Sequence, residues 1–261
     1  KIVPFLSYVL SLYLASTAAF VLWKRSTNLR DVPCINAVTT REILQVSIPL
    51  LISVSMLQVM QWTNTIMLGI FASEQEVGIF HACSKIAALM SVPLHAVNTI
   101  AAPKFGEFYG KGEMANFKKV AIQSTRLIFW VSAPILLTVF LFPVQILGLF
   151  GPEFSYGRDA LLLLSVGQFV SAISGSVGFI LVMTGNQRIH KNITLFTSLS
   201  NIGLNWILVS KYGLIGAAIS TMTSTIFWNL SMVLYIKLDM DVLTIYIPFL
   251  SKYLRRNEGF S

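Results

Sequence analysis

Residues 43–73 read ILQVSIPLLISVSMLQVMQWTNTIMLGIFAS, and this stretch of 31 residues contains no charged side chain. A helix of this length would extend about 46 Å at 1.5 Å per residue, which exceeds the ~30 Å hydrocarbon core of a bilayer. A chain in lipid must satisfy its own backbone hydrogen bonds, and a helix does so within one segment. The stretch therefore predicts a helix that spans a membrane.

Six further stretches repeat this pattern. Apolar residues make up 55% of the 261 residues and charged residues 11%, whereas a soluble domain carries about 25% charged residues. Lys85 is the one formal charge within all seven stretches. We therefore predict an all-α, polytopic membrane protein. Its seven transmembrane helices are expected at residues 2–23, 43–73, 77–103, 127–152, 160–187, 192–210 and 212–236.

Basic residues fall on alternate connections between these stretches. The connections 24–42, 104–126 and 188–191, with the tail after 236, hold 15 Lys and Arg residues, and the opposite connections hold three. The positive-inside rule places the first set in the cytoplasm and the protein in the cell membrane. The net charge of +8 is then a signal of topology. It predicts no nucleic-acid partner, because no basic domain is exposed to water.

The connections suggest how the chain is organised. Residues 24–42 are expected to form a cytoplasmic linker between a lone helix, 1–23, and a six-helix domain, 43–237. Residues 104–126 carry aromatic residues at helical spacing beside lysines, which fits either a segment in the headgroup layer or a plain basic loop. The tail, 238–261, is expected to be cytoplasmic or interfacial, and its uncharged part is alternatively the start of another helix.

The termini and cysteines add two expectations. An odd number of helices and a first residue, Lys1, that is not Met indicate a fragment that lacks an N-terminal portion. Cys34 falls in a cytoplasmic connection and Cys83 in a helix, so no disulfide is expected.

The sequence lacks the motifs of an enzyme. It contains three histidines and no HExxH, CxxC, GxSxG or Walker-type loop. The acidic residues lie in loops or at helix ends, and Glu74 and Glu76 are interpreted as solvating an outer turn. We therefore predict no catalytic residue, no metal ligands and no cofactor.

Polar residues inside the predicted spans are the candidates for a site, because each costs free energy in lipid. His81, Lys85, Ala88, Val92, His95 and Thr99 fall on one helical face. Lys85 either snorkels to the outer headgroups or provides positive charge in a water-filled cavity.

Two other spans carry rows of polar residues that include amides at helical spacing. Gln58, Gln61 and Thr65 lie on one face of their helix, and Asn201 and Asn205 extend a stripe with Thr194 and Ser198. Such stripes serve either as interhelical hydrogen bonds or as the lining of a cavity, and the sequence leaves both open.

Several segments resemble the C-terminal lobe of polysaccharide and lipid-linked oligosaccharide flippases (Wzx-like), in the multidrug, oligosaccharidyl-lipid and polysaccharide exporter superfamily. The resemblance covers roughly residues 41–237. The matching segments are NTIMLGIFASEQEVG (64–78), IFHACSKIAAL (79–89), APKFGEFYGKGE (102–113), ILGLFGPEF (146–154), LVMTGNQR (181–188) and YGLIGAAIS (212–220).

The resemblance implies a fold and a mechanism. Such transporters have two six-helix lobes around a central cavity and work by alternating access. By this resemblance the chain would comprise the C-terminal six-helix lobe of a MATE-like fold and the preceding helix, with an N-terminal lobe as a missing partner. Similar transporters carry an acidic residue near Asn64, so an amide here removes one candidate for coupling to H⁺ or Na⁺.

The function that follows is transport of a lipid-linked oligosaccharide from the inner to the outer leaflet. The alternatives are a drug and cation antiporter, a membrane glycosyltransferase or polymerase, and an inactive fragment. In the flippase reading Lys85 and Arg126 supply positive potential for a diphosphate. The side chains expected to meet sugar hydroxyls are His81, His95, Gln58, Gln61, Asn64, Asn201 and Asn205.

Overall fold

The computed structural model describes residues 3–26, 39–246 and 248, and it divides into two compact units, Lys1–Ile43 and Leu44–Ser261. The first unit contains helix α1 (Val3–Ser26). Its 24 residues would extend about 36 Å, enough to cross a hydrocarbon core. Cys34 and most of the predicted linker lie outside the described residues.

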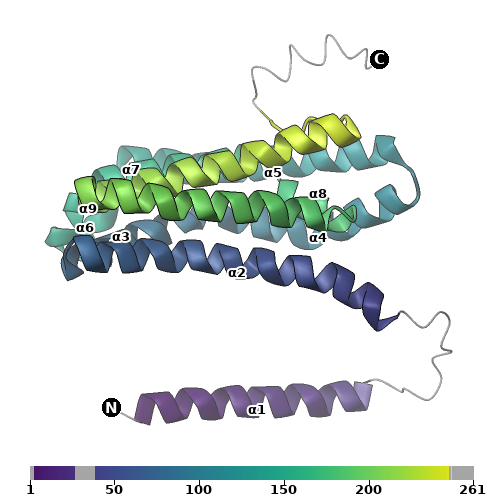
Figure 1. Cartoon of the computed structure of the whole chain (residues 1–261), viewed down its shortest axis with the longest axis horizontal. Helices are drawn as coiled ribbons and strands as arrows, with labels where there is room; N and C mark the ends of the chain where they lie inside the picture. Colours follow the sequence, from purple (N-terminus) through teal and green to yellow (C-terminus); the bar gives the residue numbers. More distant parts are fainter. Residues whose placement is uncertain (1–2, 27–38, 247, 249–261) are drawn as a thin grey trace. The chain divides into compact units, whose positions relative to one another are not determined.

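The second unit is a bundle of helices, and the described part of the chain contains no strand (Figure 1). Its elements are α2 (Thr40–Phe71), α3 (Glu74–Ala88), η1 (Leu89–Ser91), α4 (Val92–Gly110), α5 (Met114–Leu141), α6 (Pro143–Gly148), η2 (Pro152–Gly157), α7 (Arg158–Ser174), α8 (Val177–Met183) and α9 (Gln187–Met240).

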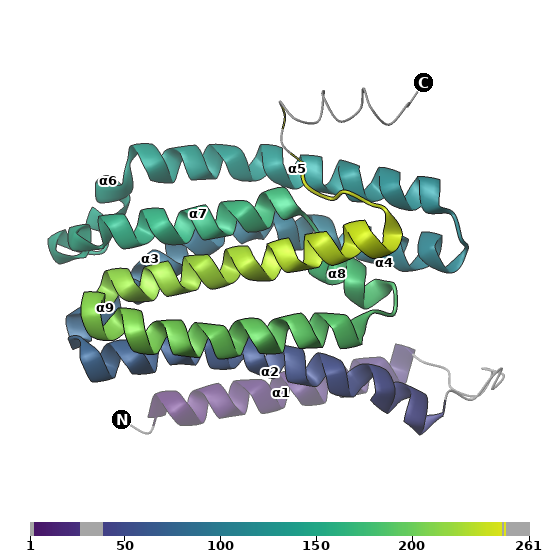
Figure 2. The ribbon, with the colours of Figure 1, turned by 45° about the horizontal axis from the view of Figure 1, so that its top comes forward.

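Four helical runs in the described residues are long and apolar enough to cross a membrane, and the bent pair formed by η2–α7 and α8 makes a fifth. The longest run, α9, has 54 residues and would measure about 81 Å if straight. It bends at Gly213, whose backbone is not helical (φ 50°, ψ −127°). Figure 2 shows its two arms side by side. The bend divides α9 into two arms that are each long enough to cross a ~30 Å core, and the expected total of seven crossings stays a prediction.

Two spans are broken where the sequence removes a backbone hydrogen bond or permits an unusual backbone. Pro93 has no N–H to donate toward Leu89, and α3 gives way to η1 immediately before it. Gly175 adopts a positive φ of 76° between α7 and α8, which are bent by 45°. A Cβ at this position would collide with Thr125 of α5, so only glycine fits this break.

The acidic turn has a more specific role than solvation. Ser73 caps α3 by accepting a hydrogen bond from the Glu76 backbone N–H, 3.2 Å away. The Glu76 carboxylate accepts a hydrogen bond from the Leu214 N–H, at 2.8 Å. This N–H follows the bend at Gly213, so Glu76 satisfies the start of the second arm of α9. The interpretation of Glu76 as a solvating side chain was therefore wrong.

Two connections also differ from the prediction. Residues 104–126 do not form a basic loop, because α4 continues to Gly110 and α5 begins at Met114, and the placement of this stretch in the headgroup layer stays a prediction. In the tail, residues 241–246 are not helical, and Val242, Thr244 and Tyr246 are buried. The Tyr246 N–H donates to the carbonyl of Ile173, so this segment packs on the bundle. Residue 247 and residues 249–261 lie outside the described part.

Packing divides the second unit into two apolar clusters. One gathers side chains of α3, α7 and α9 near the bend of α9, including Phe80, Leu161 and Leu214. The other gathers side chains of α4, α5, α8 and α9, including Phe105 and Phe117. Many large apolar side chains on the outside are exposed, as a surface that faces lipid requires.

Candidate functional site: a cavity between α2, α3, α7 and α9

A cavity of about 540 Å³ lies between α2, α3, α7 and the second arm of α9. Its volume falls in the range of about 300–1,000 Å³ that is usual for small-molecule sites. Polar side chains from all four elements contribute to its lining. The lining residues are Gln58, Gln61, Trp62, Asn64, Thr65, Phe80, His81, Ser84, Lys85, Ala87, Ala88, Leu164, Gln168 and Thr221.

The α2–α3 hairpin sets which residues face each other across this cavity. The two helices meet at a turn formed by Ala72 and Ser73. The Thr65 hydroxyl and His81 Nε2 lie 3.2 Å apart, at hydrogen-bonding distance, and this contact fixes the register. One helical turn farther from the hairpin turn, the same register brings Gln61 level with Lys85. Both line the cavity, which therefore opens between the two helices.

Lys85 is the one formal charge among the described residues of the lining, and no Asp or Glu lines the cavity. It follows the start of α3 at Glu74 by eleven residues, or about 16 Å along the axis, near the middle of a ~30 Å core. Within the described residues it forms no ion pair with a carboxylate. An ammonium at this depth requires water or an anion. Its position favours the second of the two readings, positive charge in a cavity.

Amide side chains supply most of the remaining polarity. Gln58 and Gln61 are exposed on α2, and Gln168 of α7 is half-buried in the same lining. Asn64 is only 3% exposed, and its Oδ1 has no hydrogen-bond partner within the described residues. Because an amide both donates and accepts, this lining suits a ligand that carries hydroxyl groups.

The structure brings together five of the nine side chains predicted for the site. Gln58, Gln61 and Asn64 line the cavity from α2, and His81 and Lys85 line it from α3. The helical spacing of each group is enough to place it on a single face. The hairpin register then turns the two faces toward one cavity.

His95 and Arg126 do not line the cavity. His95 lies on α4, beyond the break at η1, and it is exposed. Arg126 lies on α5, which packs against α4 and α7. Because α7 itself lines the cavity, it stands between α5 and the site. The prediction that Arg126 supplies charge to the same site as Lys85 is not met by this arrangement.

Asn201 and Asn205 also lie outside the lining, and both are fully buried. The Asn201 amide donates to the hydroxyls of Ser220, at 3.2 Å, and Ser224, at 3.0 Å. Asn205 donates to Asn201 Oδ1 at 3.0 Å. The Asn201 contacts join the two arms of α9, and Asn205 bonds to Asn201 within the first arm, so the expected place of both amides in the cavity is corrected.

Besides Phe80, four polar or aromatic lining residues were not predicted. Trp62 falls on the same face of α2 as Gln58 and Thr65, so its spacing could have revealed it. Gln168 is a single amide deep within an apolar span, which is also a usable signal. Ser84 and Thr221 carry no comparable signal, because short hydroxyl side chains in a membrane helix usually bond to their own backbone.

His190 and Cys83 each contact one neighbouring polar group within the described residues. His190 Nδ1 lies 3.1 Å from the Ser53 hydroxyl, and its ring meets Trp228 edge-on. The buried Cys83 donates from Sγ to the carbonyl of Gly157. No group of three or more His, Cys, Asp or Glu suited to a metal ion occurs in the described residues.

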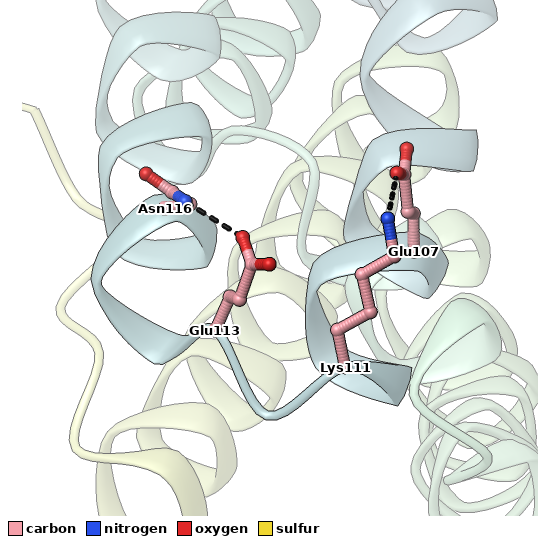
Figure 3. Close-up of polar contacts among 4 residues, drawn as sticks. All are labelled: Glu107, Lys111, Glu113 and Asn116. Carbon is pink, nitrogen blue, oxygen red and sulfur yellow. Dashed lines mark hydrogen bonds and ion pairs between the residues drawn. The ribbon is translucent and has the colours of Figure 1, made fainter.

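One end of the second unit is rich in lysine. Around the α4–α5 turn, Lys111 pairs with Glu107 at 2.6 Å, and Asn116 donates to Glu113 (Figure 3). The hydrogen bond that the Lys111 ammonium donates to the Glu107 carboxylate raises the pKa of Lys111. The Asp241 carboxylate accepts from Lys237 and lies 3.6 Å from Lys118. These cations, Lys237 first, lower the pKa of Asp241.

Comparison with known proteins gives consistent matches. The MatE family model matches residues 49–207. A probable low-salt glycan biosynthesis flippase, Agl15 of Haloferax volcanii, is 24% identical over 164 residues, 62% of this chain and 35% of that protein. The capsular polysaccharide biosynthesis protein CapF of Staphylococcus aureus is 23% identical over 186 residues, 71% of this chain and 47% of that protein.

A solved structure has the same fold. The crystal structure of MATE in the bent conformation superposes with a TM-score of 0.75 at 18% identity, over 88% of this chain and 54% of that one. The chain therefore spans roughly half or less of the proteins that it matches, and its helices correspond to one part of a larger transporter fold.

Proposed function

Because the chain belongs to the MatE family, we propose that it forms the C-terminal part of a flippase for lipid-linked oligosaccharides. In this proposal the flippase moves its substrate from the inner to the outer leaflet of the cytoplasmic membrane by alternating access. The described helices supply one wall of the transport path, and a further lobe supplies the other.

The observation that carries this proposal is the positive charge of Lys85, which pairs with no carboxylate of the described residues, in a lining without Asp or Glu. A lipid-linked oligosaccharide has a diphosphate between its polyprenyl chain and its sugars. The Lys85 ammonium attracts that diphosphate and can donate charge-assisted hydrogen bonds to its oxygens. A cationic drug would be repelled by the same lysine, which disfavours the antiporter alternative.

Each part of the lining has a role in binding. Lys85 donates charge-assisted hydrogen bonds to phosphate oxygens, and His81 adds a ring nitrogen one helical turn away. Gln58, Gln61 and Asn64 offer amide groups to the hydroxyls of the first sugars. The polyprenyl chain would lie along the lipid-facing surface, where many large apolar side chains are exposed.

The fold also supports movement. α2 forms one wall of the cavity, yet it makes few close backbone contacts with the other helices of its unit. The spans behind it are broken at η1 and at Gly175. A loosely packed wall beside bent helices can change its distance from the opposite wall at a low cost in packing energy.

Charge segregation supports the proposed orientation. Lys104, Lys111 and Lys119 lie toward the end of the unit that contains the α4–α5 turn, and Lys237 lies near the end of α9. The opposite end contains the acidic α2–α3 turn and the bend of α9. By the positive-inside rule the lysine-rich end would face the cytoplasm.

The experiment tests the role of Lys85 in the full protein. Lys85→Ala should weaken binding of undecaprenyl diphosphate about 10- to 100-fold, because hydrogen bonds to a charged group contribute about 1.5–3 kcal/mol. Surface-glycan export should fall with it. Lys85→Arg should retain most of both activities, because the guanidinium keeps the charge.

The matched control is Lys104→Ala, an exposed lysine of α4 outside the lining. It should bind and export like the parent. Unchanged binding and export in Lys85→Ala would remove Lys85 from the mechanism and, with it, the main support for an anionic substrate.

A further inference from the structure

We propose that Trp62 is a stacking platform for a neutral sugar ring of the transported glycan. This inference rests on the proposed function and adds a specificity-determining residue to it. In this arrangement the diphosphate lies against α3, and the first or second pyranose ring lies flat against the indole on α2.

Trp62 differs from the other tryptophans of the chain. Four of the five have a ring partner: Trp23 contacts Phe20, Trp130 contacts Phe129, Trp206 contacts Phe71, and Trp228 contacts His190. Within the described residues Trp62 has none, and its side chain is 64% exposed. It is also the one tryptophan that lines the cavity. Within the described residues no aromatic ring therefore covers this indole, which contributes to the cavity lining.

The depth of Trp62 argues against a role as an interfacial anchor. Tryptophans in that role lie at the boundary between lipid and headgroups. Trp62 precedes the last residue of α2, Phe71, by nine residues, which places it about 14 Å from that end of the helix. This is near the middle of a ~30 Å core, at the same level as Lys85 across the hairpin.

The chemistry around the indole matches that of a pyranose. One face of many pyranose rings presents C–H groups, and their slightly positive hydrogens are attracted to the negative face of an aromatic ring. The hydroxyls at the ring edge need donors and acceptors. Gln58 and Gln61 supply these from the same face of α2, and Ser84 lies at the same level on α3.

The positions of Trp62 and Lys85 relative to each other define how the substrate would be oriented when bound. The register set by Thr65 and His81 places Trp62 level with Ser84, next to Lys85 on the facing helix. A diphosphate bound by Lys85 therefore delivers the sugar attached to it beside the indole. A lipid diphosphate without sugars would use Lys85 and leave Trp62 uncovered.

The test compares two probes on the full protein: undecaprenyl diphosphate, and undecaprenyl diphosphate that carries a disaccharide. Trp62→Leu should weaken binding of the disaccharide-bearing lipid about 3- to 10-fold, the range expected for loss of an aromatic contact. Its binding of undecaprenyl diphosphate should change less than about 2-fold. Trp62→Phe should retain part of the preference for the sugar.

Trp206→Leu is the matched control, because Trp206 is 59% exposed but lies outside the lining. It should bind both probes like the parent. Tryptophan fluorescence provides a second measurement, in which the emission of Trp62 is the difference between the parent and Trp62→Phe. The glycan-bearing probe should alter this emission, and the bare diphosphate should not.

The outcomes separate this inference from the proposed function. Equal losses for both probes in Trp62→Leu, or no loss for either, would overturn the stacking platform while leaving Lys85 as the diphosphate ligand. If neither probe binds the parent protein, the proposed function itself fails. A selective loss for the disaccharide-bearing probe supports both.

Discussion

The amides of α2 and those of α9 begin as the same sequence signal and end in opposite environments. Gln58 and Gln61 repeat at helical spacing and line a cavity. Asn201 and Asn205 repeat at helical spacing too, but they are fully buried. The difference lies in the facing helix. The second arm of α9 offers Ser220 and Ser224 as hydrogen-bond partners, whereas a cavity lies between α2 and α3. A polar stripe becomes a binding surface only where its neighbour leaves room.

The largest expected effect concerns the close packing of the α9 arms. A Cβ on Gly216 would collide with the backbone carbonyl of Leu208, which cannot move without displacing the first arm. Gly216→Ala should therefore reduce the free energy of unfolding by about 2–3 kcal/mol. Gly203→Ala is the control on the same helix, because nothing lies within 4 Å of its added Cβ.

Thermal unfolding of the purified protein in detergent would measure both glycine variants. Gly203→Ala should be neutral or slightly stabilising, since alanine favours helix more than glycine does. If Gly216→Ala unfolds at the parent temperature, the two arms are not packed as closely as the structure shows.

The second prediction contrasts the two amide stripes directly. Asn201→Leu should reduce the free energy of unfolding by about 1–2 kcal/mol, because Ser220 and Ser224 would lose a buried partner. Gln61→Leu should change it by less than about 0.5 kcal/mol, because the side chain is exposed to the cavity.

Ligand binding should rank these two variants in the reverse order. Gln61→Leu should weaken binding of a disaccharide-bearing polyprenyl diphosphate, and Asn201→Leu should preserve it in the folded fraction. Similar losses of stability in the two variants would show that the α2 stripe is also structural, and the contrast between the regions would disappear.

The smallest effect is expected at the lysine-rich end. The pKa of Asp241 is lowered by Lys237 and Lys118, so its contribution to stability is present above its ordinary value of 3.8 and is lost as the pH falls below it. Asp241→Asn should unfold at a slightly lower temperature than the parent at pH 7, and the two should converge as the pH falls through the lowered pKa of Asp241. A difference that persists below that pKa would assign the effect to something other than this charge.

Much of the fold was predictable because a membrane makes local patterns decisive. The uncharged stretches predicted where the helices lie, and the alternating basic connections predicted that the two ends of the bundle differ in charge. The residues at which the helices begin and end were less predictable. Helix α5 begins at Met114 although Lys118, Lys119 and Arg126 follow, because charged residues near a membrane surface do not interrupt a helix. The bend at Gly213 relies on Glu76, 137 residues earlier in the chain, which no local pattern reveals.

The sequence by itself determined that this is an all-α membrane protein, and it placed Lys85, His81 and the glutamines on definite helical faces, because a period of 3.6 residues follows from backbone geometry alone. The tertiary structure decided which faces meet. It set Gln61 level with Lys85, enclosed Asn201 between the arms of α9, and removed Arg126 from the site by placing α7 in front of it. Periodicity specifies the direction of a side chain from its own helix, whereas its partner depends on the packing of helices distant in sequence.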